Sequence, residues 1–138
     1  MTRSRSRRTQ TCSEAEGRSR LDQARKFQDV ADLSASEADT DYTSVAAALA
    51  VLAGIAAADA ACCKALGRRS RGQDHHEAED LVRQIVPGGR DAANALRRLI
   101  NMKDEAHYGF FDVSGKDVQA AIRQAKTLVD FAETVLQR

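Results

Sequence analysis

The sequence is poor in aromatic residues and in proline. It contains no tryptophan, two tyrosines, four phenylalanines and one proline in 138 residues. Strands favour large aromatic side chains, so their scarcity argues against a sheet-based core. Small apolar residues, together with abundant Arg, Glu, Gln and Asp, favour helices instead. The length suits one domain with one modest core, and we expect an all-α fold.

Recognisable membrane and export signals are also missing. The longest apolar run, Val45 to Ala58, has 14 residues, fewer than the ~20 that a spanning helix needs. The basic start of the chain is not followed by the apolar region of a signal peptide. Three cysteines, two of them adjacent at Cys62 and Cys63, do not suggest a disulfide framework. These features predict a reduced, cytoplasmic protein with no membrane contact and no cofactor.

Charge is unevenly distributed along the chain. The net charge is +1, but residues 1–20 carry six arginines against Glu14 and Glu16, whereas residues 21–138 are mildly acidic. A segment with so little to bury is expected to be disordered when alone. We therefore predict a disordered basic tail over residues 1–12, which either attracts phosphates or only aids solubility, and a single helical domain over residues 13–138.

Five helical segments follow this tail. Capping residues and glycine or proline breaks place them at about residues 13–34, 41–66, 74–86, 90–107 and 114–138. Short connections between helices make neighbours antiparallel. The sequence thus predicts an antiparallel four- to five-helix bundle, in which the 67–77 loop and residues 103–108 share one end.

An acidic residue interrupts the clearest apolar stripe. In the second segment, apolar side chains recur at helical spacing from Val45 through Leu52 to Leu66, and Asp59 falls on the same stripe. A carboxylate on a buried stripe is costly unless it is paired. Asp59 is therefore the first indication of a site.

The fourth segment places two further reactive groups on an inward stripe. Lys103 and His107 continue the series Ala93, Leu96 and Ile100, and lie one turn apart. Histidine exchanges protons near neutral pH, and lysine stabilises negative charge on phosphate. Two interpretations stay open: a functional pocket that includes Asp59, or a structural ion pair between Asp59 and Lys103.

The candidate site residues come from the two segments expected to share one end of the bundle. His107 and Lys103 are the catalytic candidates. The binding candidates are Asp59, Arg68, Arg69, Arg71, Asp74, His75 and Tyr108. His75 and the adjacent His76 point in different directions on a helix, so we expect no metal site.

The long alanine-rich helix, the arginine-rich connection after it and the stretch "AHYGF" at residues 106–110 resemble the HEPN superfamily (higher eukaryotes and prokaryotes nucleotide-binding). The resemblance covers about residues 41–138 and implies a helical bundle that commonly forms homodimers. Nuclease members carry an arginine, four to six further residues and then a histidine. His107 and Tyr108 fit the end of this pattern, but Ile100, Asn101 and Met102 stand where the arginine is expected.

This resemblance, with the arginine missing, implies an RNA- or nucleotide-binding or regulatory module, with a protein antitoxin as a possible partner in a toxin–antitoxin or defence system. Two alternatives remain. One is a metal-independent ribonuclease in which His107 is the acid/base group, assisted by Lys103 or by an arginine among residues 68–71. The other is a purely structural or oligomer-forming bundle.

Overall fold

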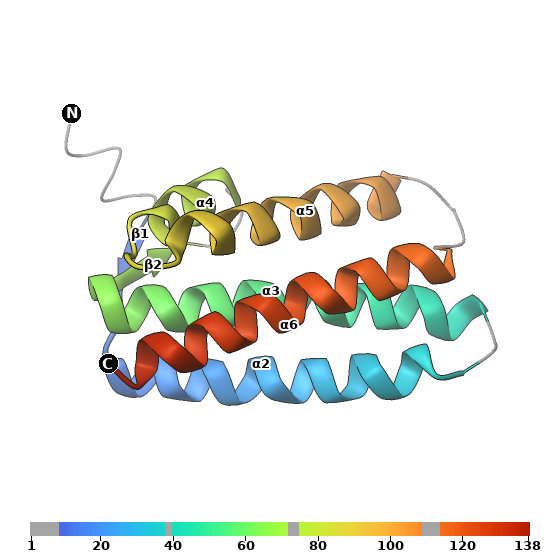
Figure 1. The fold of residues 1–138 in the computed structure, drawn as a ribbon, viewed down its shortest axis with the longest axis horizontal. Coiled ribbons are helices and arrows are strands. Elements are labelled where there is room, and N and C mark those ends of the chain that lie inside the picture. Colours follow the sequence, from blue (N-terminus) through green and yellow to red (C-terminus); the bar gives the residue numbers. More distant parts are fainter. Residues whose placement is uncertain (1–8, 38–39, 72–74, 109–113) are drawn as a thin grey trace.

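Five helices and one short pair of strands make up the part of the chain that the computed structural model describes (Figure 1). That part is residues 9–37, 40–71, 75–108 and 114–138, with the backbone alone for Thr40 and residues 104–108. In chain order, the elements are β1 (Thr9–Thr11), α2 (Glu14–Ala35), α3 (Thr40–Leu66), β2 (Arg68–Ser70), α4 (His75–Arg83), α5 (Gly89–Tyr108) and α6 (Gly115–Leu136). The predicted all-α antiparallel bundle is confirmed, with the small sheet as an addition.

Consecutive long helices run in opposite directions. Helices α3 and α6 pack against each other in the middle, α2 covers one side of this pair, and α5 covers the other (Figure 1). The short helix α4 packs on the first part of α5. Both ends of the described chain, and both strands, lie at the end of the bundle where α3 finishes (Figure 1).

Side chains with no more than one carbon beyond the backbone let α3 sit at the centre of the bundle. Ala50, Ala53, Ala57 and Ala60 are fully buried. At Gly54, an added Cβ would overlap the side chain of Leu99. The helix is long and apolar enough to cross a membrane, yet 72% of its apolar window is buried against the rest of the protein. This is the environment of a core helix.

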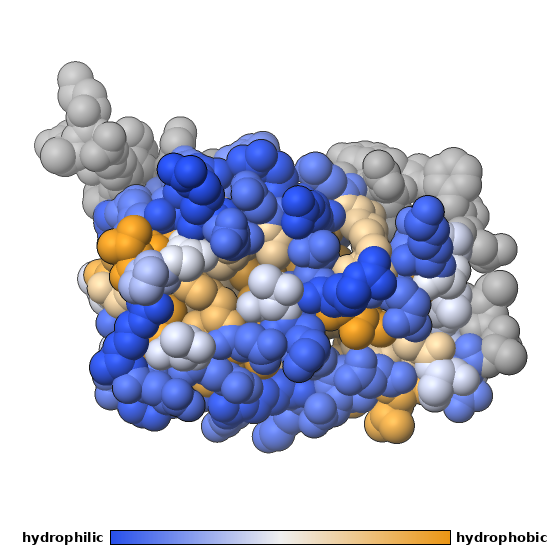
Figure 2. Space-filling view, viewed as in Figure 1, coloured by the Kyte–Doolittle hydropathy of each residue, from blue (hydrophilic) through white to orange (hydrophobic). Residues whose placement is uncertain are grey.

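The predicted apolar stripe of α3 is only partly correct. Val45 and Leu52 are 49% and 45% exposed, whereas Asp59 is buried as expected. The first half of the helix buries its alanine face, because only small residues fit between neighbours that approach this closely. Figure 2 shows that hydrophilic side chains cover most of one face of the bundle, with apolar patches between the α4–α5 layer and α2.

The predicted meeting of the 67–77 loop with residues 103–108 holds for one contact, 3.3 Å between Nε2 of His75 and Nζ of Lys103, but the two segments do not share one end of the bundle. Helix α5 starts at the end where α3 finishes, and its last residues lie at the opposite end (Figure 1). The prediction assumed that the third helical segment spans the whole length of the bundle. However, α4 has 9 residues against 27 in α3, so it covers only about a third of that length at 1.5 Å per residue.

The predicted disordered tail is wrong for residues 9–12. Thr9–Thr11 form β1, which pairs antiparallel with β2 in the register Thr9 with Ser70 and Thr11 with Arg68. Gly67 makes this pairing possible. Its φ of +70° ends α3 and turns the chain back toward β1, and its carbonyl oxygen accepts a 3.0 Å hydrogen bond from the Cys12 amide. Residues 1–8 lie outside the described part.

Gly54 tests the close packing of α3. We expect Gly54→Val to lower the free energy of unfolding by ~1–3 kcal/mol, because the added atoms meet the buried side chains of Leu99 and Leu128. The matched control is Ala48→Val on the exposed face of the same helix, which should cost less than about 0.7 kcal/mol. Urea unfolding measures both values, and equal losses would contradict this account of the core.

Candidate functional site

A disulfide bond joins the start of the chain to the end of α3. Cys12 and Cys63 are covalently linked across 51 positions of sequence, with their Cα atoms 5.2 Å apart, inside the usual range for disulfides. The prediction that the cysteines are reduced is therefore corrected. Spacing alone did not reveal the pair, because Cys12 lies in the segment that composition assigned to the disordered tail. Cys62 remains a free, buried thiol.

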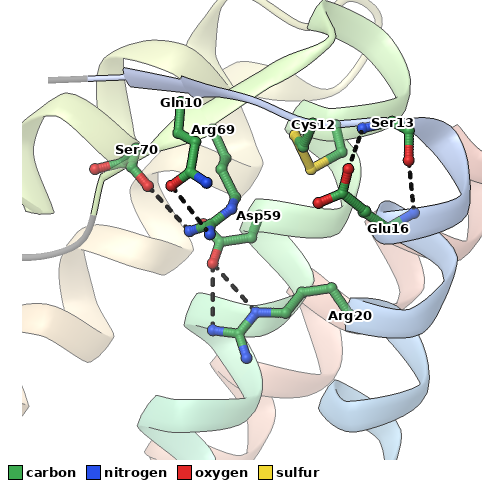
Figure 3. The surroundings of a disulfide bond; sticks show 9 residues. Gln10, Cys12, Ser13, Glu16, Arg20, Asp59, Arg69 and Ser70 are labelled. Carbon is green, nitrogen blue, oxygen red and sulfur yellow. Dashed lines mark hydrogen bonds and ion pairs between the residues drawn. A yellow bond between two sulfur atoms is a disulfide. The ribbon is translucent and has the colours of Figure 1, made fainter. Parts of the chain in front are cut away.

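The strand pair places an arginine-rich segment beside this disulfide (Figure 3). On β2, Arg69 donates to the side-chain oxygen of Gln10 at 3.4 Å and to the carbonyl oxygen of Ser70 at 3.4 Å. Arg68 and Arg69 are partly buried and Arg71 is exposed. Three arginines thus lie within four consecutive residues at this end of the bundle.

Asp59 is buried, as the sequence predicted, but its partner is different. Nε and Nη2 of Arg20 on α2 both lie 3.3 Å from Oδ2 of Asp59. The predicted pairing with Lys103 is wrong, because the α2 face opposite Asp59 supplies a closer cation. Arg20 was missed, since the weak apolar pattern of its helix gave no sign of which face turns inward.

Burial dominates the protonation equilibria of this region. Burial raises the pKa of Asp59 above its ordinary value of 3.8, while the charges of Arg20 and then Arg69 lower it in part. Burial, with the charge of Asp59 as a further cause, raises the pKa of the Cys62 thiol to about 12. Cys62 therefore stays protonated, and hence weakly nucleophilic, near neutral pH.

An open cavity of about 620 Å³ lies between the first turns of α2 and the residue Arg69 of β2. Its lining consists of Ala15, Glu16, Ser19, Arg20, Gln23, Cys63 and Arg69. Arg20, Arg69 and the disulfide-bonded Cys63 therefore border a common space. Glu16 is held away from the arginines by the capping box of α2, in which its carboxylate accepts from the Ser13 amide at 3.2 Å.

Two of the predicted site residues meet away from this cavity. Nζ of Lys103 lies 3.3 Å from Nε2 of His75. The side chain of Lys103 is exposed, so its predicted place on the inward stripe of α5 is wrong, although Leu96 and Ile100 of that stripe are buried. Asp74 and the side chains of His107 and Tyr108 lie outside the described residues.

The structure separates the candidates into two groups. Asp59, Arg68 and Arg69 lie near the disulfide with Arg71, whereas His75 and Lys103 lie together on the surface between α4 and α5. No cluster of three or more His, Cys, Asp or Glu side chains suited to a metal occurs within the described residues. The arrangement near the disulfide offers guanidinium donors for an anion and a sulfur–sulfur bond for exchange chemistry.

A second buried acid has a structural role. Glu79 on α4 is 5% exposed, and its Oε2 lies 3.6 Å from Nε of Arg97 on α5. The ion pair ties the short helix to its longer neighbour and needs no functional explanation.

Comparison of the chain with protein-family models, curated proteins and solved structures finds no match.

The ion pair between Arg20 and Asp59 makes a first prediction for this region. Arg20→Gln should lower the free energy of unfolding at neutral pH by ~1–3 kcal/mol, because Asp59 keeps its buried charge without its main partner. Arg18→Gln on the same helix is the control, since its pair with Glu14 is exposed and should be worth less than about 1 kcal/mol. Equal losses in urea unfolding would contradict the role of Arg20.

The same pair predicts a pH dependence with a definite sign. Because the folded state raises the pKa of Asp59, it binds the proton more tightly than the unfolded state. The contribution of Asp59 to the free energy of unfolding should therefore fall as pH rises above 3.8 toward the folded pKa. Asp59→Asn should remove this fall, and Arg20→Gln should extend it to higher pH.

The disulfide predicts a stability difference that depends on reductant. Cys12→Ser should lower the free energy of unfolding by ~2–4 kcal/mol, because the unfolded chain loses a constraint across a long loop. Adding dithiothreitol should bring the wild-type protein to the stability of Cys12→Ser and leave that variant unchanged. Cys62→Ala retains the disulfide and should still respond to reductant. A wild-type protein insensitive to reductant would exclude a stabilising bond.

Proposed function

We propose that this protein is an RNA- or nucleotide-binding module that contacts phosphates through the arginine-rich end of its bundle. The observation that carries the proposal is the pairing of β1 with β2. It brings Arg68, Arg69 and Arg71 to the point where the segment with Arg3, Arg5, Arg7 and Arg8 joins the fold, because Thr9 pairs with Ser70. Arginine is suited to phosphate, since its planar guanidinium donates two parallel hydrogen bonds.

The local charge balance supports an anionic ligand. Asp59 is an acid close to Arg69, and its charge is already engaged by Arg20 at 3.3 Å. Residues 68–71 carry three arginines and no acid, a local concentration of positive charge that a phosphate backbone can neutralise. The chain as a whole has a net charge of only +1, so binding depends on this concentration of charge at one end and not on overall attraction.

The same proposal includes a HEPN-like relationship, a homodimer, a protein antitoxin as partner and a cytoplasmic location. The helical bundle is compatible with a HEPN-like relationship. The disulfide weighs against a cytoplasmic location, because disulfides are rare in cytosolic proteins unless they are transient or redox-sensing.

One observation favours the ribonuclease alternative, in a modified form. Lys103 and His75 are 3.3 Å apart, so an imidazole that exchanges protons near neutral pH lies beside a cation. His107, the acid/base group predicted from the sequence, has no described side chain to compare with this pair. Cleavage is therefore measured together with binding.

The test is the salt dependence of RNA affinity. Fluorescence anisotropy of a labelled single-stranded RNA gives the dissociation constant across a series of salt concentrations, and gel electrophoresis of the same samples detects cleavage. Replacing both Arg68 and Arg71 by Gln should weaken binding and reduce the slope of log affinity against log salt by about 1.4, at ~0.7 per lost phosphate contact. Deleting residues 1–8 should reduce the slope further.

The matched control has the same change in net charge elsewhere. Arg123→Gln with Lys126→Gln alters the exposed face of α6 and should leave affinity and slope nearly unchanged. If the β2 variant and the α6 control lose affinity equally, or if the wild-type protein does not bind RNA, the proposal fails. Cleavage that disappears in His75→Ala or His107→Ala would favour the ribonuclease.

A further inference from the structure

The disulfide is the strongest attachment of β1 to the bundle. The strand has three residues, none with an apolar side chain, and all are exposed or partly exposed. Besides the ladder with β2, its contacts include the 3.0 Å hydrogen bond from the adjacent Cys12 amide to Gly67 and the 3.4 Å hydrogen bond from Arg69 to Gln10. A two-stranded ladder of this length is marginal by itself in water.

The cavity beside α2 gives small molecules a route to this bond. Cys63 belongs to its lining, whereas Cys12 does not, and the cavity, at about 620 Å³, has room for a small thiol. Arg20 and Arg69 stand on the same walls. Nearby guanidinium groups favour a thiolate over a thiol, and the thiolate is the form that attacks a disulfide.

We propose that the Cys12–Cys63 disulfide is a thiol-exchange site, entered through this cavity, that controls whether β1 stays docked. The thiolate of a small thiol attacks Sγ of Cys63, a bond forms between these two sulfurs, and the Cys12–Cys63 bond breaks. Cys12 leaves as a thiolate and takes a proton from water. A second thiol then attacks the mixed disulfide, which releases Cys63 as a thiol and the reductant as its own disulfide.

Exchange uses an external thiol because the neighbouring cysteine is unsuited to the reaction. Cys62 is 3% exposed, and the adjacent position on a helix points about 100° away from Cys63. It is also protonated near neutral pH, as its raised pKa requires. Reduction therefore ends with Cys12 and Cys63 as thiols, without reshuffling to Cys62.

Release of β1 regulates the phosphate-binding end, a consequence that rests on the proposed function. The strand pair fixes Thr9 opposite Ser70, and four arginines precede Thr9 in the sequence. Once β1 detaches, the point at which this basic segment joins the fold is no longer fixed beside β2, and RNA binding has to restore that order. Reducing conditions should thus weaken binding.

The experiment treats the oxidised full-length protein with glutathione at increasing ratios of reduced to oxidised form. Peptide mass spectrometry should find glutathione on Cys63 as the intermediate. In this register the amides of residues 10 and 12 face the partner strand, as the Cys12–Gly67 bond shows. Hydrogen exchange of these two amides should accelerate at least ~10-fold after reduction, to the rate found in Cys12→Ser. The dissociation constant for RNA should rise ~3- to 10-fold. Cys62→Ala should behave as the wild-type protein.

A cavity-filling variant tests the route of entry. Ser19 lines the cavity and is exposed, so Ser19→Phe should slow the exchange, whereas Ser36→Phe at the other end of α2 should not. Glutathione found on Cys12 alone, or equal rates in both variants, would overturn entry through the cavity.

The two proposals fail separately. If reduction leaves the exchange of the β1 amides and the RNA affinity unchanged, the inferred switch is wrong while the RNA-binding proposal stands. If the oxidised protein binds no RNA, the proposed function fails, and mass spectrometry with hydrogen exchange still decides whether thiols release β1.

Discussion

The close approach of α3 to its neighbours is the constraint on which the rest of the structure depends. Buried alanines such as Ala53 and Ala57, with Gly54 between them, let the side chains of Leu99 on α5 and Leu128 on α6 pack directly against the backbone of α3. Packing of this kind stabilises through many short-range dispersion contacts and tolerates little added volume. It also fixes where Asp59 lies. Asp59 lies near the end of this helix and is covered by α2. The cation that pairs with it, Arg20, therefore comes from α2.

Local rules located the helices well, because their signals are carried by neighbouring residues. The Ser13 capping box, the Ser114 cap and Gly67 mark helix ends in the structure close to where the sequence placed them. The register of buried faces was harder. In α3 an alanine-rich sequence offers several faces of similar hydrophobicity, so periodicity selected Val45 and Leu52, which are exposed. Side-chain volume decides which face of α3 is buried, and a hydrophobicity pattern contains no information on volume.

The candidate site depended even more on contacts between distant segments. Asp59 was predictable because an acid on a buried helix needs a partner, and the arginines of residues 68–71 because they follow a helix end. Cys12 and Arg20 carry no local signal: their importance arises only when β1 and α2 fold back on α3. The position of Lys103 was predicted wrongly because α4 was assumed to span the whole length of the bundle. Since α4 is short, α5 starts at the opposite end from the one assumed, and its last residues lie at the other end too.

The bond between Cys12 and Cys63 covalently joins the start of α2 to the end of α3. With its outer ends joined, the pair forms a covalent ring whose opposite side is the connection between Ala35 and Thr40. While the bond is intact, the two helices are therefore covalently joined at both ends, and neither end is free to separate. Breaking the bond leaves only the connection after Ala35, so the end of the pair beside the arginines becomes free to open.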